Sequence, residues 1–354
     1  MGTFLLAATS LRDMTDLGKV DRDFFDEYIY PRLGATRDDV ALGPTHGVDF
    51  GLLDIDGTAV ALATDPVSVL PALGFERAGQ FAIDIVLSDI AVSGLDPSHL
   101  AISFTLPPEM TDAEFAELWA AMHDEAEDLG VSIVTGHTAR YSDCSYPWVG
   151  GATALAVGDH DDVVRPDGAR PGDDVLVTKG PAVETTGLLT TLFPDGFDGL
   201  GPDTLEIAQE RLDETDAVRD AMTVSAAGGH GVHAMHDATE CGVHGALNEI
   251  AGSAGVQLEI DESSIPFRPG VRDVCEYLDI DPWRSTTAGS LIVATDPEVT
   301  DDVISALNAR GTPVGVAGTV VLGEGVVVDG KRIDHPDVDP SWGAYERLAN
   351  EAEK

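Results

Sequence analysis

The chain has 354 residues, of which 43% are hydrophobic and 23% are charged, so it is able to bury a substantial core and is not globally disordered. Its charge is unbalanced, because 63 acidic residues face 20 Lys and Arg residues and give a net charge of −43. Such a surface repels nucleic-acid phosphates and anionic lipid, so we expect neither nucleic acid nor a membrane among its partners. The length favours two domains.

Two further features of the composition concern the environment of the protein. Only four of the 20 cationic residues are lysines, and an acidic, lysine-poor surface resembles that of proteins from salt-accumulating halophiles. The three cysteines, Cys144, Cys241 and Cys275, do not suggest a disulfide framework. Since no run of 18 apolar residues occurs either, the sequence predicts a soluble, cytoplasmic protein.

Hydrophobic periodicity predicts both helices and strands in the first half of the chain. Helices are expected at residues 23–33, 81–92 and 111–130. Thr111 and Glu114 fit a capping box at the start of the third helix. Strands are expected at residues 59–64, 131–134 and 152–157, with a loop at 135–138.

Residues 158–174 are rich in Gly, Pro and Asp and form the expected boundary between two domains. Beyond it, strands are expected at residues 174–178, 256–260, 290–295, 314–321 and 325–328. Helices are expected at residues 204–222, around 248–254 and at 301–309. Because helices and strands mix without strict alternation, the sequence predicts two α+β domains, at 1–160 and 161–340, and a polar, peripheral tail at 341–354.

Three acidic residues of the first half, Asp49, Asp65 and Asp89, lie beside small or apolar neighbours instead of in a charged run. A carboxylate in such surroundings needs a cation or several hydrogen-bond donors. Converging carboxylates suit Mg²⁺, which most often bridges to nucleotide phosphates. The segment Thr135-Gly136-His137-Thr138 offers backbone N–H groups and a hydroxyl to the same anion.

A second group of candidate ligands is crowded into fifteen residues of the second half. It consists of His230, His233, His236, Cys241 and His244. These residue types are zinc ligands, but a Gly-rich segment that lines a cleft explains the pattern as well. Both interpretations stay open from the sequence.

Six ordered blocks of sequence resemble the AIR synthase superfamily, and within it the family of the hydrogenase maturation factor HypE. The blocks are ATDP (63–66), LSDIAVSGLDP (87–97), VTGHTA (134–139), LVTKGPAVETTGLL (176–189), MHDATECGVHGALNEIA (235–251) and IPFRPGVRDVCEYLDIDP (265–282). The resemblance covers roughly residues 18–330. It implies a two-domain PurM-like α+β fold, in which an N-domain with a mixed sheet and helices forms a homodimer and an α+β C-domain closes over the cleft.

The resemblance also implies which residues bind ATP and its metal ion. Asp49, Asp65 and Asp89 match the acidic positions that hold ATP through Mg²⁺. Gly136 and Thr138 match the Gly and Thr of the family's G-D-T, with His137 in the place of its Asp, and all three are expected beside the nucleotide.

A further block implies the position of the substrate. Asp237 and Thr239 match the Asp and Thr of M-R-D-P-T, and with Gly242 they are expected in a cleft of the C-domain. The implied activity is ATP-dependent activation of an oxygen of a small-molecule substrate by phosphoryl transfer, with other maturation proteins as further partners.

Several positions depart from the HypE pattern. HypE ends in a cysteine, whereas this chain ends in LANEAEK. Ala288 stands where the family's A-N-E-G carries Glu, and Ser88 replaces the Asn of N-D-I. His137 replaces a metal-binding Asp, and because this removes one negative charge we expect weaker Mg²⁺ binding than is usual in the family. Two alternatives therefore stay open, a non-catalytic nucleotide-binding maturation factor and a ligase like aminoimidazole ribonucleotide synthase.

Overall fold

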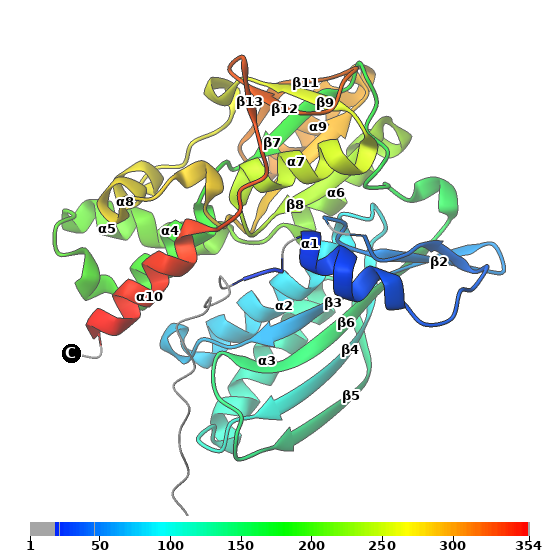
Figure 1. Cartoon of the computed structure of the whole chain (residues 1–354). Helices are drawn as coiled ribbons and strands as arrows, with labels where there is room; N and C mark the ends of the chain where they lie inside the picture. Colours follow the sequence, from blue (N-terminus) through cyan, green and yellow to red (C-terminus); the bar gives the residue numbers. More distant parts are fainter. Residues whose placement is uncertain (1–17, 21, 46, 353–354) are drawn as a thin grey trace, which may run out of the picture.

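The protein folds around two β-sheets, which are covered by helices (Figure 1). The structure is a computed structural model, and it describes residues 18–20, 22–45 and 47–352. The sheets lie on either side of residue 160, where we propose the domain boundary. Two halves with mixed helices and strands confirm the expected α+β class.

The first sheet has six strands in the order β1-β2-β3-β6-β4-β5. They are β1 (Val40–Leu42), β2 (Gly51–Ile55), β3 (Thr58–Ser68), β4 (Pro97–Leu106), β5 (Ser132–Arg140) and β6 (Trp148–Gly158). Only β4 and β5 run parallel; the other neighbours are antiparallel. Two long helices, α2 (Phe75–Ala91) and α3 (Asp112–Asp128), pack together against this sheet. The expected capping box begins α3, because Thr111 accepts from Glu114 N and Glu114 accepts from Thr111 N.

The second sheet has seven strands in the order β13-β12-β9-β11-β7-β10-β8. They are β7 (Asp174–Thr178), β8 (Val232–Ala238), β9 (Gln257–Ile260), β10 (Ser290–Thr295), β11 (Val314–Val321), β12 (Gly325–Val328) and β13 (Lys331–Ile333). The helices of this half are α4 (Val183–Leu192), α5 (Pro202–Gln209), α6 (Val218–Gly228), α7 (Gly242–Ala254), α8 (Val271–Leu278), α9 (Pro297–Arg310) and α10 (Pro340–Ala352).

Strand β10 shows why this sheet is covered on both faces. All six of its residues are buried. Successive side chains of a strand point to opposite faces. Leu291 and Val293 accordingly join the core that contains Val303 of α9, whereas Ile292 joins the core that contains Leu247 of α7.

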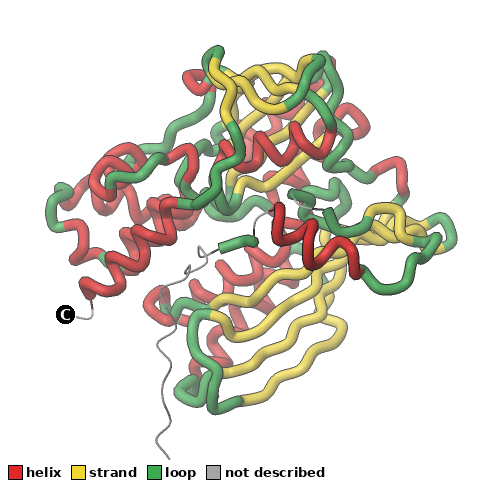
Figure 2. The backbone as a smooth tube through the Cα atoms, viewed as in Figure 1, coloured by secondary structure: helices red, strands yellow, loops and turns green. Residues whose placement is uncertain are grey.

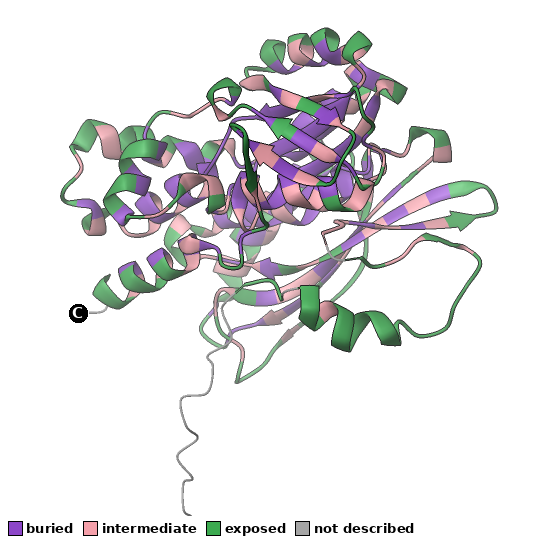
Figure 3. Ribbon diagram, turned by 45° about the horizontal axis from the view of Figure 1, so that its top comes forward, coloured by how far each residue is buried: buried purple, intermediate pink, exposed green. Residues whose placement is uncertain are grey.

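Helix α2 connects the two halves of the molecule. It contacts α3 and the first sheet, and it also contacts α6 and β8 of the second half (Figure 2). One continuous apolar core therefore contains Val86 of α2 and Val224 of α6. By contrast, the helical segment 22–32, which begins with α1 (Arg22–Phe24), lies on the surface and is almost wholly exposed (Figure 3).

Three expectations about local structure are wrong. Strand β3 continues through Asp65 to Ser68, since Asp65 pairs with Ala152 of β6. The expected loop 135–138 belongs to β5 and pairs with β4. The expected helix 204–222 is two helices, because a 3₁₀ segment at Glu210–Glu214 separates α5 from α6.

The expectation of a polar, peripheral tail is also wrong. Residues 340–352 form helix α10, in which Ala344 and Leu348 are buried. These side chains pack in one cluster with Phe197 and Val274. The apolar residues of α10 are few and lie between polar ones, so the sequence did not indicate a buried face. The residues that cover this face come from distant segments of the chain.

Candidate functional site

Carboxylates from both halves of the chain gather where the two halves meet. Asp49 lies just before β2, Asp65 lies on β3 and Asp89 lies in the last turn of α2. Asp237 of β8 reaches the same place from the second half, and Ser88 Oγ donates a hydrogen bond of 2.8 Å to its Oδ2. Asp49, Asp65 and Asp89 all lie in the electrostatic field of Asp237, and Asp89 also lies in the field of the other two.

His236 lies in the middle of this group. Its Nδ1 is 3.2 Å from Asp49 Oδ2 and 3.8 Å from Asp237 Oδ1, and its Nε2 is 3.3 Å from Glu249 Oε2. Burial lowers the pKa of His236, but the carboxylates of Asp49 and Glu249 outweigh it and raise the pKa to about 10. His236 is therefore an imidazolium at neutral pH, in the position where the family's M-R-D-P-T carries Arg.

Lys19 supplies a second positive charge. Its Nζ lies 3.5 Å from Thr239 Oγ1, and its backbone N–H donates to Glu240 at 2.8 Å. Burial lowers the pKa of Lys19, but the carboxylates of Asp89, Glu249 and Asp49 raise it by more, so the ammonium stays charged. Lys19 precedes all six sequence blocks, and no sequence signal marked it.

Asp49, Asp65 and Asp89 hold protons more tightly than free aspartates do. Burial and the neighbouring Asp237 raise the pKa of Asp49 to about 7, although His236 opposes the shift. Burial also raises the pKa of Asp65, although a hydrogen bond with Asp89 opposes this, and burial with the nearby aspartates raises the pKa of Asp89 well above its usual value. The site therefore brings together more carboxylates than its own cations neutralise, and some of these groups retain a proton that a further cation would displace.

These residues fit a hard divalent cation. Five carboxylates, those of Asp49, Asp65, Asp89, Asp237 and Glu249, face only two cations. The buried Oδ1 of Asp237 has no hydrogen-bond donor among the described residues. Carboxylate oxygens are the ligands that Mg²⁺ prefers.

The zinc interpretation of the histidine-rich segment is wrong for the described residues. Among the described residues, Asp49, His236 and Asp237 are the only group of three whose ligand atoms lie close enough to share a metal ion, and only His236 of this group is one of the five zinc candidates. His233 instead contacts Asp173 at 2.9 Å, and His244 contacts Glu262 at 2.9 Å. These residues separate because they belong to β8 and α7, which point them to different partners.

The segment 136–138 lies apart from this cluster. Gly136, His137 and Thr138 are exposed on β5, at the edge of the first sheet. Strand β5 is three positions from β3, which is about 14 Å at the usual spacing of strands. The structure therefore does not bring these residues together with Asp65 within one chain.

The other residues expected in the C-domain cleft lie near Asp237. Thr239 follows β8 and contacts Lys19. Gly242 begins α7 with a φ of +61°, and a Cβ at this position would approach Ser285 O to 2.6 Å. Only glycine fits this close approach without strain.

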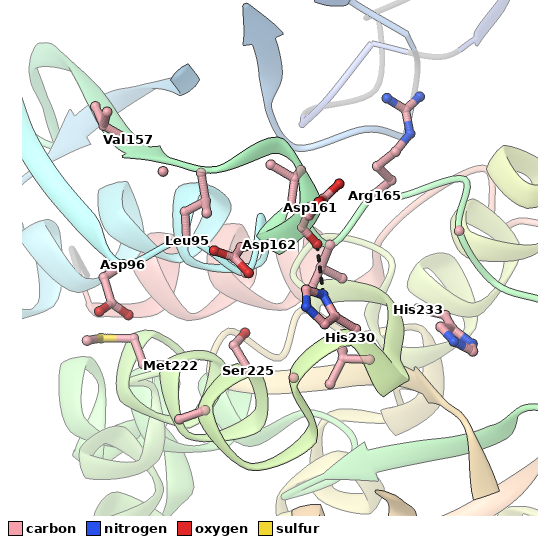
Figure 4. Close-up of a pocket in the computed structure, with 18 of the residues that line it drawn as sticks. Leu95, Asp96, Val157, Asp161, Asp162, Arg165, Met222, Ser225, His230 and His233 are labelled. Carbon is pink, nitrogen blue, oxygen red and sulfur yellow. Dashed lines mark hydrogen bonds between the residues drawn. The ribbon is translucent and has the colours of Figure 1, made fainter. Parts of the chain in front are cut away.

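Two cavities lie along the junction of the halves. One, of about 220 Å³, is lined by Asp65, Asp89 and Thr239 and adjoins the carboxylates. The larger, of about 570 Å³, is lined by Asp96, Asp162 and His230, whose Nδ1 lies 3.0 Å from Asp161 O (Figure 4). Of the residues singled out in the sequence, only His230 and His233 line the larger cavity, and none of those expected to bind ATP, Mg²⁺ or substrate does. The smaller cavity is therefore the candidate active-site cavity.

Comparisons with known proteins agree with this arrangement. Residues 47–158 match the N-terminal domain, and residues 170–331 the C-terminal domain, of AIR synthase related protein. Carbamoyl dehydratase HypE of Rhodobacter capsulatus is 31% identical over 280 residues, which cover 76% of each chain.

Solved structures show the same fold. E. coli HypE has a TM-score of 0.68 at 25% identity, covering 90% of this chain and 96% of that one. HypE in complex with ATP has a TM-score of 0.66 at 24% identity, covering 90% and 93%. No helix among the described residues has the length and apolar character needed to cross a membrane. With both domain models matched and a relative 31% identical over most of its length, the chain belongs to the AIR synthase related family and is similar to its HypE members.

Proposed function

We propose that this protein is a HypE-like, ATP-dependent enzyme that activates an oxygen of a small substrate by phosphoryl transfer. The main support is that Asp49, Asp65, Asp89 and Asp237, which come from both halves of the chain, gather at one junction where carboxylates outnumber cations. The similarity to carbamoyl dehydratase HypE and to a HypE structure with bound ATP agrees with it. Phosphoryl transfer depends mainly on positioning and on neutralised charge, and it needs no protein nucleophile.

In this proposal, Asp49, Asp65 and Asp89 would hold Mg²⁺, which would neutralise the charge of the triphosphate, although among the described residues only Asp49, His236 and Asp237 already bring three ligand atoms close enough to share an ion. His236 and Lys19 reduce the repulsion among the surrounding carboxylates by supplying positive charge between them. Ser88 fixes Asp237 by its hydrogen bond.

The proposal also includes an assembly. The exposed edge of β5 supports pairing of two copies through the first half, which would add Gly136, His137 and Thr138 to a shared nucleotide site. We also propose that the protein acts in a cytoplasm of high salt content and that other maturation proteins are among its partners.

Calorimetry in molar KCl tests nucleotide binding directly. We expect wild-type protein to bind ATP only with Mg²⁺, and the double variant Asp65→Asn/Asp89→Asn to lose this binding. The matched control Asp124→Asn/Asp301→Asn removes two exposed carboxylates from α3 and α9 and keeps full binding. Absence of binding by the wild type, or unchanged binding by the first double variant, removes the proposal.

The two alternatives differ in turnover and not in binding. A non-catalytic maturation factor binds Mg²⁺-ATP but forms no ADP with any acceptor. A ligase like aminoimidazole ribonucleotide synthase forms ADP with a phosphate-ester amide. ADP release measured with amides, amines and phosphate esters therefore separates the three functions.

A further inference from the structure

The cavity of about 220 Å³ beside the carboxylate site has walls from three parts of the chain. The first half contributes Asp65 and Asp89, and the second half contributes Glu184 of α4 and Thr286. Helix α10, beyond the two matched domains, closes it with Trp342. It is thus open to the proposed nucleotide site but built mostly from other residues.

Glu184 lines this cavity, and the described residues donate hydrogen bonds to only one of its two oxygens. Its Oε2 accepts hydrogen bonds from Thr286 Oγ1 at 3.0 Å and from the backbone N–H of Ala288 at 3.1 Å. No described residue donates a hydrogen bond to its Oε1, so this oxygen is available to a ligand. Ala288 stands where the family's A-N-E-G carries Glu. Glu184 of α4, which is hydrogen-bonded to the backbone of Ala288, supplies a carboxylate near this position instead.

The charge of the cavity selects its ligand. Four carboxylates line it, against the single ammonium of Lys19. Asp65 and Asp89 are the proposed Mg²⁺ ligands, whereas no metal ion would neutralise Glu184 and Glu240. The Lys19 ammonium already lies in the field of Asp89, Glu249 and Asp49. An anionic ligand would therefore meet repulsion from several sides.

The remaining walls are apolar and aromatic. Phe81, Trp148, Trp342 and Tyr345 all line the cavity. Aromatic side chains bind flat rings through offset or edge contacts and attract cations to their faces. The aromatic walls and the carboxylates therefore both favour a flat ligand that is cationic or uncharged.

We propose that this cavity is the acceptor pocket and that it takes a small, flat, cationic or uncharged compound whose N–H groups bind Glu184, and not a carboxylate or a phosphate ester. This inference rests on the proposed function, because the pocket is the acceptor's only if ATP binds at the neighbouring aspartates. An amidinium or amide matches the free carboxylate oxygen by a charge-assisted hydrogen bond.

Three probes of nearly equal size test the selection by charge: benzamidine, benzamide and benzoate. Calorimetry at fixed KCl concentration is expected to give at least tenfold tighter binding of benzamidine than of benzoate, with benzamide between them. Glu184→Gln should weaken benzamidine binding about tenfold, whereas the control Glu117→Gln, at an exposed position of α3, should leave it unchanged.

The pH dependence gives a second readout. Burial raises the pKa of Glu184 to about 7, the hydrogen bonds from Ala288 and Thr286 oppose this, and the carboxylates of Asp339 and Glu240 add to it. Benzamidine binding by the wild type should therefore strengthen between pH 6 and pH 8, and this rise should be smaller in Glu184→Gln.

Mg²⁺-ATP binding is measured on the same samples, so that the two proposals fail separately. Benzoate binding as tightly as benzamidine, no binding of any probe, or benzamidine binding insensitive to Glu184→Gln overturns the pocket while ATP binding persists. Displacement of benzamidine by Mg²⁺-ATP assigns the cavity to the nucleotide and also overturns it. Discrimination among the probes without any ATP binding removes the enzyme function and leaves only the ligand chemistry of the cavity.

Discussion

Ser88 on α2 and Asp237 on β8, 149 residues apart in the chain, are joined by a buried hydrogen bond of 2.8 Å. The contact holds a carboxylate of the second half against a helix of the first. It therefore contributes to both the stability of the domain interface and the geometry of the acidic site.

We expect Ser88→Ala to lower the free energy of unfolding by about 1–3 kcal/mol, because a buried carboxylate loses a donor. Urea unfolding in KCl with EDTA measures this without a compensating metal ion. The control Ser225→Ala removes a buried Oγ that has no hydrogen-bond partner among the described residues, so it should cost little. Equal losses in the two variants would mean that the hydrogen bond to Asp237 contributes no stability.

Asp84 on α2 makes the stability of the domain interface depend on pH. Burial raises its pKa to about 8, and Asp216 and Glu125 add to the shift while Arg219 opposes it. Since the unfolded pKa is about 4, the folded state holds the proton more tightly. The stabilisation is complete below pH 4 and is lost as the pH rises through 8.

Asp84→Asn removes this titration, and we expect the variant to exceed the wild type by about 1–3 kcal/mol at pH 8 and by less at pH 5. Urea unfolding at the two pH values measures the difference, with Asp124→Asn on the exposed face of α3 as control. A gain that is the same at both pH values would show that Asp84 is ionised in the folded protein throughout.

Leu348 anchors α10, since its side chain is 5% exposed and packs with Phe197 and Val274. We expect Leu348→Ala to lower the free energy of unfolding by about 2–4 kcal/mol through lost burial and the cavity left behind. Leu322→Ala makes the same truncation at a side chain that is 87% exposed, and it should change stability by less than about 0.5 kcal/mol. Thermal unfolding compares the two, and similar shifts would contradict the packing of α10.

Patterns that depend on near neighbours could be read from the sequence. The alternating and apolar runs gave the bounds of β7, β10, β11 and β12 as the structure has them, and Thr111 with Glu114 marked the start of α3. The apolar surroundings of Asp49, Asp65 and Asp89 marked them as unusual carboxylates, and the structure brings them to one junction. In each case the signal lies within one strand or one or two helical turns.

Only the tertiary structure decided which charges meet. His236, Glu249 and Lys19 join Asp49 because β8, α7 and the start of the chain pack at one junction, and nothing local in their sequence specifies that contact. The same holds for Glu184 and for α10, whose partners are more than 60 residues away in the chain. Local sequence sets backbone propensity, whereas the partner of a buried charge is set by the packing of distant segments, so this part of the site became visible only in the folded protein.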